Sequence, residues 1–281
     1  LDPDRAPKTW SELVKYSKIL TQRDKRTERL RVCGVGLGQS DFGQGWNFLI
    51  DSLIPQNGGK VINKNGTQIL WNSKQGIEAF KYYTDFIKKH KVNSHLFPKP
   101  YDAFKLGRCA MMINGNWTIS ALERDTYTLE KQKKDIKQGN PTKKVFEYGV
   151  AQVPFKKKRS VYGTYWANCV TSRAKGNEIK EAWKFVKFLA SKESMLFWVK
   201  KVKELPMRKV IARKSIIRKN FPKLRAFLDS LPYSYASLKK NEGVYKLAVT
   251  HALERIILKD MKVKDAVKIA QEEVDEMLKT E

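Results

Sequence analysis

Short apolar segments bounded by turn residues alternate along this chain with segments in which apolar residues recur every three or four positions. The first kind indicates strands, at residues 30–35, 109–113, 148–153 and 161–172. The second kind indicates helices, at residues 10–20, 46–54, 73–92, 177–190, 193–203 and 263–278. Strands that alternate with helices are typical of an α/β protein, and we expect that fold class here.

Local motifs mark where these elements begin and end. Thr9 and Glu12 form a capping-box pattern at the start of the first helix. The pair Asn65-Gly66 tolerates positive φ and predicts a hairpin turn. A second such pair, Asn114-Gly115, ends the strand at 109–113, and we expect Asn114 to cap the helix that follows. Trp117 therefore lies just beyond a turn, where a large aromatic side chain either fills a core or contacts a partner.

A glycine-rich loop occupies residues 34–45 (GVGLGQSDFGQG). Its G-x-G-x-G spacing matches neither the dinucleotide-binding pattern nor the P-loop pattern, and Asp41 would repel a phosphate. We therefore expect no nucleotide cofactor. The loop is expected to deliver Trp46 to the start of the next helix.

The chain is strongly basic, with 56 Lys and Arg against 29 Asp and Glu, a net charge of +27. Such an excess suggests an anionic partner such as nucleic acid, an anionic membrane surface or an acidic ligand. The basic residues are scattered, however, with only modest clusters at 131–137, 156–159 and 200–203, and residues 123–147 are expected to form a surface helix and loop. Charge of this kind predicts non-specific affinity for anions, and no specific nucleic-acid partner is expected.

The cysteine and histidine positions do not predict a metal site. Cys33, Cys109 and Cys169 are far apart without a C-x-x-C pair, and the three histidines have no metal-ligand spacing. Buried free thiols are the expected state, with a single disulfide as the alternative. No segment approaches the ~20 apolar residues that span a bilayer. The start, LDPDRAPKTW, has no signal-peptide h-region and no Met, which indicates a processed or truncated product.

Catalytic motifs do not occur either. The sequence has neither a G-x-S-x-G nucleophile elbow nor an H-E-x-x-H metal motif. Paired carboxylates such as Glu272-Glu273 are expected on a solvated helix face. We therefore predict a protein that is not an enzyme.

The order of several segments resembles a known family. These are PKTWSELVKYSKILT, GGKVINKNGTQILWNSKQ, DAFKLGRCAMMINGNWTISAL, YGVAQVPF, EAWKFVKFLASKESMLFW and KELPMRK. Together they resemble the extracellular solute-binding proteins of ABC importers, the family of the maltose- and oligosaccharide-binding proteins. The most specific stretch is AFKLGRCAMMINGNW, which matches the family's "aF..GkaAM.i.G.W" pattern.

The resemblance implies a two-lobe, type II periplasmic-binding-protein fold. Residues 1–153 and 206–281 would form the C-terminal lobe, and residues 154–205 would return to an N-terminal lobe that is mostly absent from this chain. A sugar or oligosaccharide would bind in the cleft between the lobes, hinge closure would follow, and the closed form would deliver the solute to the permease of the importer. The family also implies a periplasmic or extracellular monomer, with lipoprotein anchoring through the missing N-terminus.

A sugar cleft needs aromatic platforms for C–H faces and planar hydrogen-bonding groups for hydroxyl edges. The resemblance and these requirements together select eight candidate ligand-binding residues: Trp117, Trp46, Asn116, Tyr165, Trp166, Gly163, Tyr233 and Arg208. Each has an alternative structural role. Trp117 could cover a core, and Arg208 could form a salt bridge at a helix end. We expect Trp10, Trp71, Trp183 and Trp198 to be core residues because of their context.

Two further functions stay open from the sequence. A basic module that binds anionic polymers or surfaces would explain the charge and would show steep salt dependence. A receptor for an anionic solute, such as a sugar phosphate, would reconcile the charge with the family.

Overall fold

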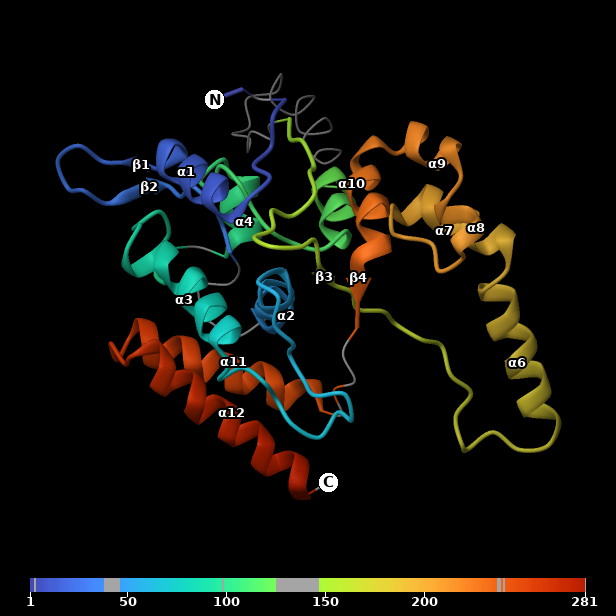
Figure 1. Cartoon of the computed structure of the whole chain (residues 1–281). Helices are drawn as coiled ribbons and strands as arrows, with labels where there is room; N and C mark the ends of the chain where they lie inside the picture. Colours follow the sequence, from blue (N-terminus) through green and yellow to red (C-terminus); the bar gives the residue numbers. More distant parts are fainter. Residues whose placement is uncertain are drawn as a thin grey trace, which may run out of the picture.

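The computed structural model of this 281-residue chain describes residues 1–2, 4–37, 46–97, 99–124, 147–236, 239 and 241–280 (Figure 1). The helices are α1 (Trp10–Leu20), α2 (Trp46–Gln56), α3 (Lys74–Lys88), α4 (Pro100–Lys105), α6 (Asn177–Leu189), α7 (Lys192–Val202), α8 (Lys209–Ala212), α9 (Ser215–Asn220), α10 (Pro222–Ser230), the 3-10 turn η1 (Leu231–Tyr233), α11 (Glu242–Ile257) and α12 (Val263–Thr280). Residues 117–124 are also helical. The strands are β1 (Gln22–Arg23), β2 (Leu30–Val32), β3 (Val161–Tyr162) and β4 (Ser234–Tyr235).

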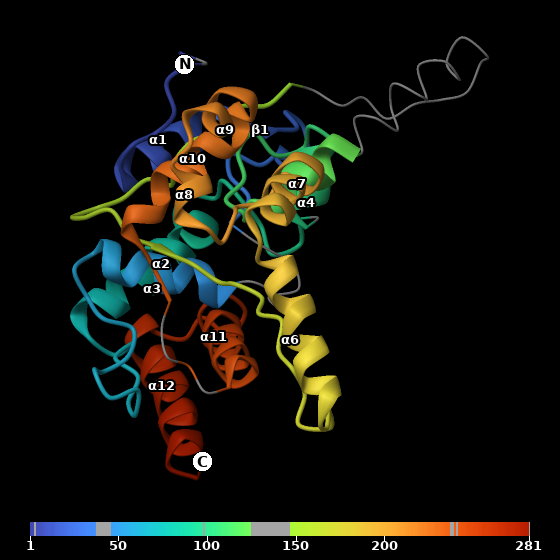
Figure 2. The same cartoon turned by 90° about the vertical axis from the view of Figure 1, so that its right-hand side faces the viewer.

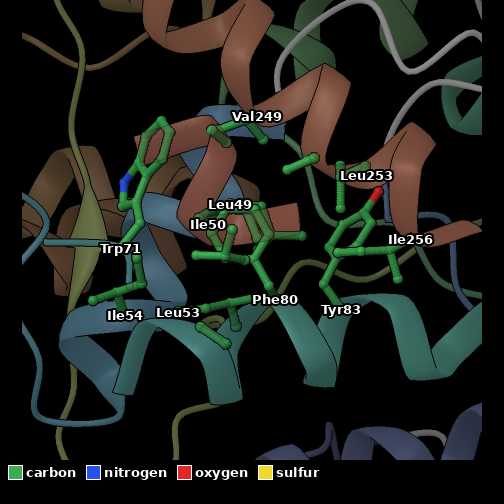
Figure 3. Packing of buried hydrophobic residues seen from close by; sticks show 14 of the residues in the cluster. Leu49, Ile50, Leu53, Ile54, Trp71, Phe80, Tyr83, Val249, Leu253 and Ile256 are labelled. Atoms are coloured by element: carbon green, nitrogen blue, oxygen red, sulfur yellow. The ribbon is translucent and has the colours of Figure 1, made fainter. Parts of the chain in front are cut away.

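The main core lies between α1, α2, α3, α11 and α12. Figure 3 shows side chains from α2, α3 and α11 that meet there, with the fully buried Trp71 at one side of the cluster. The Trp71 ring makes edge contacts with Phe80, at 6.0 Å between centroids, and with Tyr245, at 6.3 Å. The amphipathic helices predicted at 73–92 and 263–278 are confirmed as α3 and α12, because their apolar faces, which include Phe80 and Val274, lie in this core.

The start of α1 follows the predicted capping box. The Thr9 hydroxyl accepts a hydrogen bond from the Glu12 amide at 3.1 Å, and the Glu12 carboxylate accepts one from the Lys8 amide at 2.7 Å. This arrangement aims Trp10 inward, where its ring stacks on Tyr82 with centroids 4.1 Å apart. The predicted hairpin at Asn65-Gly66 is also present, with Ile62 bridged to Ile69 and Gly66 at φ 72°.

Two smaller cores complete the molecule. One joins α7, α8, α9 and α10, and Ile119 from the helix at 117–124 packs into it. The other surrounds Cys33, Cys109 and Phe104. The helix at 117–124 connects these two cores, because its Leu122 belongs to the second of them.

Strand pairing is sparser than the sequence predicts. Residues 33–36 and 109–113 pair in parallel, with Gly36 N donating to Met111 O at 2.8 Å. The strands predicted at 148–153 and 161–172 are wrong for most of their length. Only Val161–Tyr162 forms a strand, and residues 163–172 run as an extended, exposed segment without a ladder partner among the residues that the structure describes. The α/β class is correct, but helices dominate it.

The prediction of free thiols is wrong for two of the three cysteines. Cys33 and Cys109 form a disulfide, and both are buried. The parallel pairing of Cys33 with Cys109 brings their side chains together, which the sequence separation of 76 residues conceals. Cys169 is free and exposed rather than buried.

Helix α6 has no buried residue, which corrects the expectation for Trp183. Trp183 is 49% exposed and Phe188 is 59% exposed, and Trp198 on α7 is also exposed. Figures 1 and 2 place α6 at the edge of the molecule, beside the extended segment that precedes it. Its largest apolar side chains therefore stay exposed within the described part of the chain, whereas Trp10 and Trp71 are core residues as predicted.

Two further observations bear on the predictions. No helix among the described residues is long and apolar enough to cross a membrane. Residues 125–146 of the predicted surface helix and loop, with the basic cluster at 131–137, and most of the glycine-rich loop at 34–45 lie outside the described residues.

We predict that opening the disulfide destabilises the protein. A Cys33→Ser, Cys109→Ser variant should lose about 3 kcal/mol of unfolding free energy, because the bond closes a long loop in the unfolded chain. Urea unfolding of the oxidised protein and the variant measures this loss. Cys169→Ser is the control and should leave the midpoint unchanged, since that thiol is exposed and free. Equal midpoints for all three proteins would contradict the prediction.

Candidate functional site

The chain leaves the main core at β3 and returns to it at β4, and these two strands lie side by side. They pair in parallel, with Val161 opposite Ser234 and Tyr162 opposite Tyr235. Gly163 N donates to Tyr235 O at 2.7 Å, which ends the pairing. Helices α6 to α10 all lie between these strands in sequence, so β3 and β4 are the crossover that connects them to the main core (Figure 1).

Helix α2 holds the crossover through its polar side chains. Gln56 accepts from the Trp10 indole N–H at 2.7 Å and donates to Ser160 O at 2.8 Å. The Ser52 hydroxyl accepts from Tyr162 N at 2.9 Å. Because α2 is itself part of the main core, the position of β3 is fixed to that core.

Aromatic rings gather on the same side of α2. The Tyr162 ring stacks on Phe48 with centroids 5.4 Å apart and meets the edge of Tyr235 at 5.7 Å. The Tyr235 hydroxyl donates to the backbone oxygen of Asp51. Gly163 lies at the end of this cluster, and from there the exposed segment carrying Tyr165 and Trp166 begins.

A buried ion pair completes the crossover. The Lys239 ammonium donates to the Asp51 carboxylate, and the two side chains are 1% and 0% exposed. Burial raises the pKa of Asp51 to about 6, against the opposing pull of Lys239. Burial by itself would lower the pKa of Lys239, but the Asp51 and Glu242 carboxylates outweigh it and raise that pKa. Both groups are therefore charged at neutral pH.

Trp117 lies at the predicted turn and is 46% exposed. Its indole folds back over Gly115, where an added Cβ would lie only 2.1 Å from the nearest ring atom. The ring occupies the space that a side chain at residue 115 would need, so glycine at this position permits the folded-back orientation. Asn114 does not cap the helix as predicted, because its side-chain oxygen accepts from the adjacent Gly115 amide at 2.8 Å. Asn116, half-buried, directly precedes the helix.

Two extended segments, residues 33–36 and 109–112, pair in parallel, and the chain continues from their shared carboxyl end to the start of α2 and to the Trp117 turn. Residues 33–36 lead through the glycine-rich loop to Trp46, and residues 109–112 lead to Trp117. In α/β folds, ligands bind outside the carboxyl ends of parallel strands. Trp46 begins α2, but its side chain lies outside what the structure describes.

The other candidates occupy different positions. Tyr165 and Trp166 are 78% and 97% exposed, with no cover from the described chain. Tyr233 is half-buried near the crossover, and its hydroxyl lies 2.9 Å from that of Ser230. The Arg208 guanidinium donates a hydrogen bond to Ala190 O, at the end of α6. Arg208 therefore contacts a helix end, but it does so through a backbone carbonyl and not through the salt bridge given as its alternative role.

An apolar recess lies at the same end of the parallel pair, between Leu37, Ile113 and Pro154. It offers no polar group to a solute, because the hydroxyls of its two tyrosines, Tyr82 and Tyr83, already donate to backbone oxygens. No cluster of His, Cys, Asp or Glu in the described residues could hold a metal ion. The recess is a packing gap, and the candidate site consists of the Trp117 turn and the crossover.

A sequence model of bacterial extracellular solute-binding proteins matches residues 2–223. The chain belongs to this family. The resemblance seen in the sequence is therefore confirmed, and so is the two-lobe periplasmic-binding-protein fold class.

Individual relatives of this solute-binding protein are distant. It is 25% identical over 195 residues to the putative ABC transporter periplasmic-binding protein YcjN of Escherichia coli, covering 69% of this chain and 39% of that one. It is 24% identical over 222 residues to the sn-glycerol-3-phosphate-binding periplasmic protein UgpB of Pectobacterium atrosepticum, covering 74% and 43%. A solute-binding protein of Thermotoga lettingae solved with α-D-tagatose superposes with a TM-score of 0.75 at 23% identity, covering 99% of this chain and 66% of that one. The chain thus spans less than half the length of these two curated relatives.

We predict that the solute-binding protein depends on both members of the buried ion pair. Lys239→Met should cost on the order of 3 kcal/mol of unfolding free energy near pH 8, since it leaves the Asp51 carboxylate buried without a cation. Because loss of Lys239 raises the pKa of Asp51 further, the folded variant takes up a proton more readily than the unfolded one. The deficit should therefore shrink as the pH falls to about 5.

Urea unfolding of Asp51→Asn, Lys239→Met and the double variant measures the coupling. The double variant should lose less than the sum of the single variants, because it leaves no uncompensated charge. Additive losses that do not change with pH would contradict the ion pair.

Proposed function

We propose that this protein is the extracytoplasmic solute-binding component of an ABC importer, and that it captures a sugar, an oligosaccharide or a phosphate ester of a small polyol. The observation that carries the proposal is the orientation of Trp117 on Gly115. A half-exposed indole packed against Gly115 offers an apolar face at the end of a parallel pair. Such a face suits the C–H side of a sugar ring.

The crossover supports a hinge between two lobes. Two adjacent extended connections allow rotation about a single axis with little change elsewhere. The predicted division places residues 154–205 in the returning lobe. Helix α7, before residue 205, shares a core with α8 to α10 and with Ile119 of the helix that begins at Trp117, so our proposal limits the part that moves on closure to residues 163–190, which precede α7. Closure would bring this segment, with the rest of the N-terminal lobe, toward the Trp117 turn, and a permease would recognise the closed form.

The exposed face of α6 supports an additional lobe in the whole protein. Ile179, Trp183 and Phe188 are all at least 40% exposed, which is unusual for one helix of a globular protein. The relatives are longer than this chain. We propose that the remaining part of the N-terminal lobe covers α6, and that Tyr165 and Trp166 line the cleft from that side.

We include phosphate esters among the proposed solutes because of the positive net charge of the chain and the name of one relative. The chain carries a net charge of +27, which would raise the local concentration of an anionic solute. The relative from Pectobacterium atrosepticum is named for binding sn-glycerol 3-phosphate. A site for a neutral sugar would show little salt dependence, whereas a site for a phosphate ester would weaken as salt is added.

The disulfide supports an oxidising compartment. Structural disulfides persist in the periplasm and outside the cell and are rare in the cytosol. Cys33–Cys109 therefore agrees with the periplasmic or extracellular location typical of the family. Membrane anchoring, a monomeric state and action without a cofactor or nucleic acid remain parts of the same proposal.

Tryptophan fluorescence titration tests the proposed site. D-tagatose, maltotriose and sn-glycerol 3-phosphate form the panel, each at low and high salt. We expect a saturable change with one class of solute. Trp117→Ala should then weaken binding about 30-fold, the effect expected when an aromatic anchor is truncated.

A glycine substitution provides a sharper variant. Gly115→Ala keeps the indole but places a methyl group within about 2 Å of it, so the ring must move and binding should weaken as in Trp117→Ala. Gly149→Ala is the control, because its added Cβ meets nothing within 4 Å. Full affinity in the Gly115→Ala variant would remove Trp117 from the site, and no response to any solute in the panel would contradict the proposed solute class.

A further inference from the structure

The segment that holds α8 and α9 concentrates positive charge. Residues 208–220 carry six basic side chains and no acidic one: Arg208, Lys209, Arg213, Lys214, Arg218 and Lys219. A segment of this length with the average composition of the chain would have a net charge of only about +1. Figures 1 and 2 both place α9 at the outer rim of the molecule, where a flat partner can reach it.

Most of this charge is not neutralised within the described part of the chain. Arg218 pairs with Asp229 at 3.2 Å, and Arg208 donates to a backbone oxygen. Lys209, Arg213, Lys214 and Lys219 have no ion pair among the described residues, and all except the half-buried Lys214 are exposed. Four cations are therefore available to an external anion.

Apolar side chains are exposed between these cations. Helix α8 buries Ile211 and Ala212, and α9 buries Ile217, in the core shared with α7 and α10. The residue before each of these two isoleucines stays in water: Val210 is 63% exposed and Ile216 is 50% exposed. Met207, just before α8, is 60% exposed. Neither helix needs these side chains for its own packing.

We propose that this surface, defined by Met207, Lys209, Val210, Arg213, Lys214, Ile216 and Lys219, docks on an anionic phospholipid bilayer. The cations would contact lipid phosphates, while the three apolar side chains would enter the boundary between headgroups and acyl chains. A soluble polyanion would neutralise the charge but would bury none of the apolar side chains. This proposal does not depend on which solute the protein binds.

Co-sedimentation with vesicles tests the proposal on the 281-residue chain. Vesicles of phosphatidylcholine alone are compared with vesicles that also contain phosphatidylglycerol. We expect binding only to the anionic vesicles, and steep weakening with added salt. Lys209→Ser, Arg213→Ser, Lys214→Ser should lower the partition coefficient about 100-fold, since each basic residue near an anionic surface contributes about a fivefold effect.

Two further variants separate this surface from the general charge of the protein. Lys259→Ser, Lys262→Ser, Lys264→Ser removes the same charge from exposed lysines in the α11–α12 connection and the first turn of α12, and this variant should bind nearly as the unmodified chain does. Met207→Ser, Val210→Ser, Ile216→Ser keeps the charge and should lose at least tenfold in binding to vesicles, while its binding to soluble polyphosphate stays unchanged.

Three outcomes would overturn the proposal. Equal losses in the two lysine and arginine variants would indicate general electrostatic attraction. Unchanged vesicle binding after loss of the three apolar residues would indicate that a soluble polyanion is the partner instead. Absence of binding to anionic vesicles by the unmodified chain would exclude the bilayer, and this measurement needs no variant that must fold.

Discussion

A single buried carboxylate, Asp51, ties the crossover to the main core. It lies in α2, whose residues from Leu49 to Gln56 are all buried, and it has no exposed surface. Lys239, which follows β4, supplies its countercharge, and the Tyr235 hydroxyl donates to its backbone oxygen. A buried ion pair contributes little net stability, but breaking it is costly. The main effect of the Asp51–Lys239 pair is therefore to fix the position at which β4 returns to the main core, and its net contribution to stability is small.

The remaining site geometry follows from that constraint. Because Gln56 and Ser52 on the same helix hold the segment at 160–162, both ends of the crossover are positioned by α2. The start of α2 also follows the loop that leaves the parallel pair at residue 37. Helix α2 thus contacts the crossover and also begins near the carboxyl end of the parallel segments 33–36 and 109–112, where the Trp117 turn lies. Substitutions in α2 would shift both parts of the candidate site together.

The sequence predicts local features better than it predicts long-range contacts. The capping box at Thr9, the Asn65-Gly66 turn and the core roles of Trp10 and Trp71 depend on neighbours in sequence or on helical period, and all are present. The disulfide depends on the pairing of residues 76 apart, which no local pattern reveals. Trp183 looks like a core residue because α6 is amphipathic, but period alone does not show whether anything covers the apolar face.

The candidate site shows the same limit. Trp117 could be predicted, because a turn followed by an aromatic residue is a local pattern, and the family resemblance added its role. Asp51 has a local signal: it is the single charged residue in the largely apolar run WNFLIDSLI, and such a residue needs a buried partner. Lys239 had no such signal, since it is one of many lysines in a basic chain.

Hydrogen exchange with and without bound solute tests the central claim most directly. If the Trp117 turn and the crossover form one solute site, amides at 115–119 and at 161–163 should both gain protection when the solute identified by titration is added. The gain should vanish in the Gly115→Ala variant at the same solute concentration. Protection confined to a region away from both segments, such as the β1–β2 hairpin, would contradict the account.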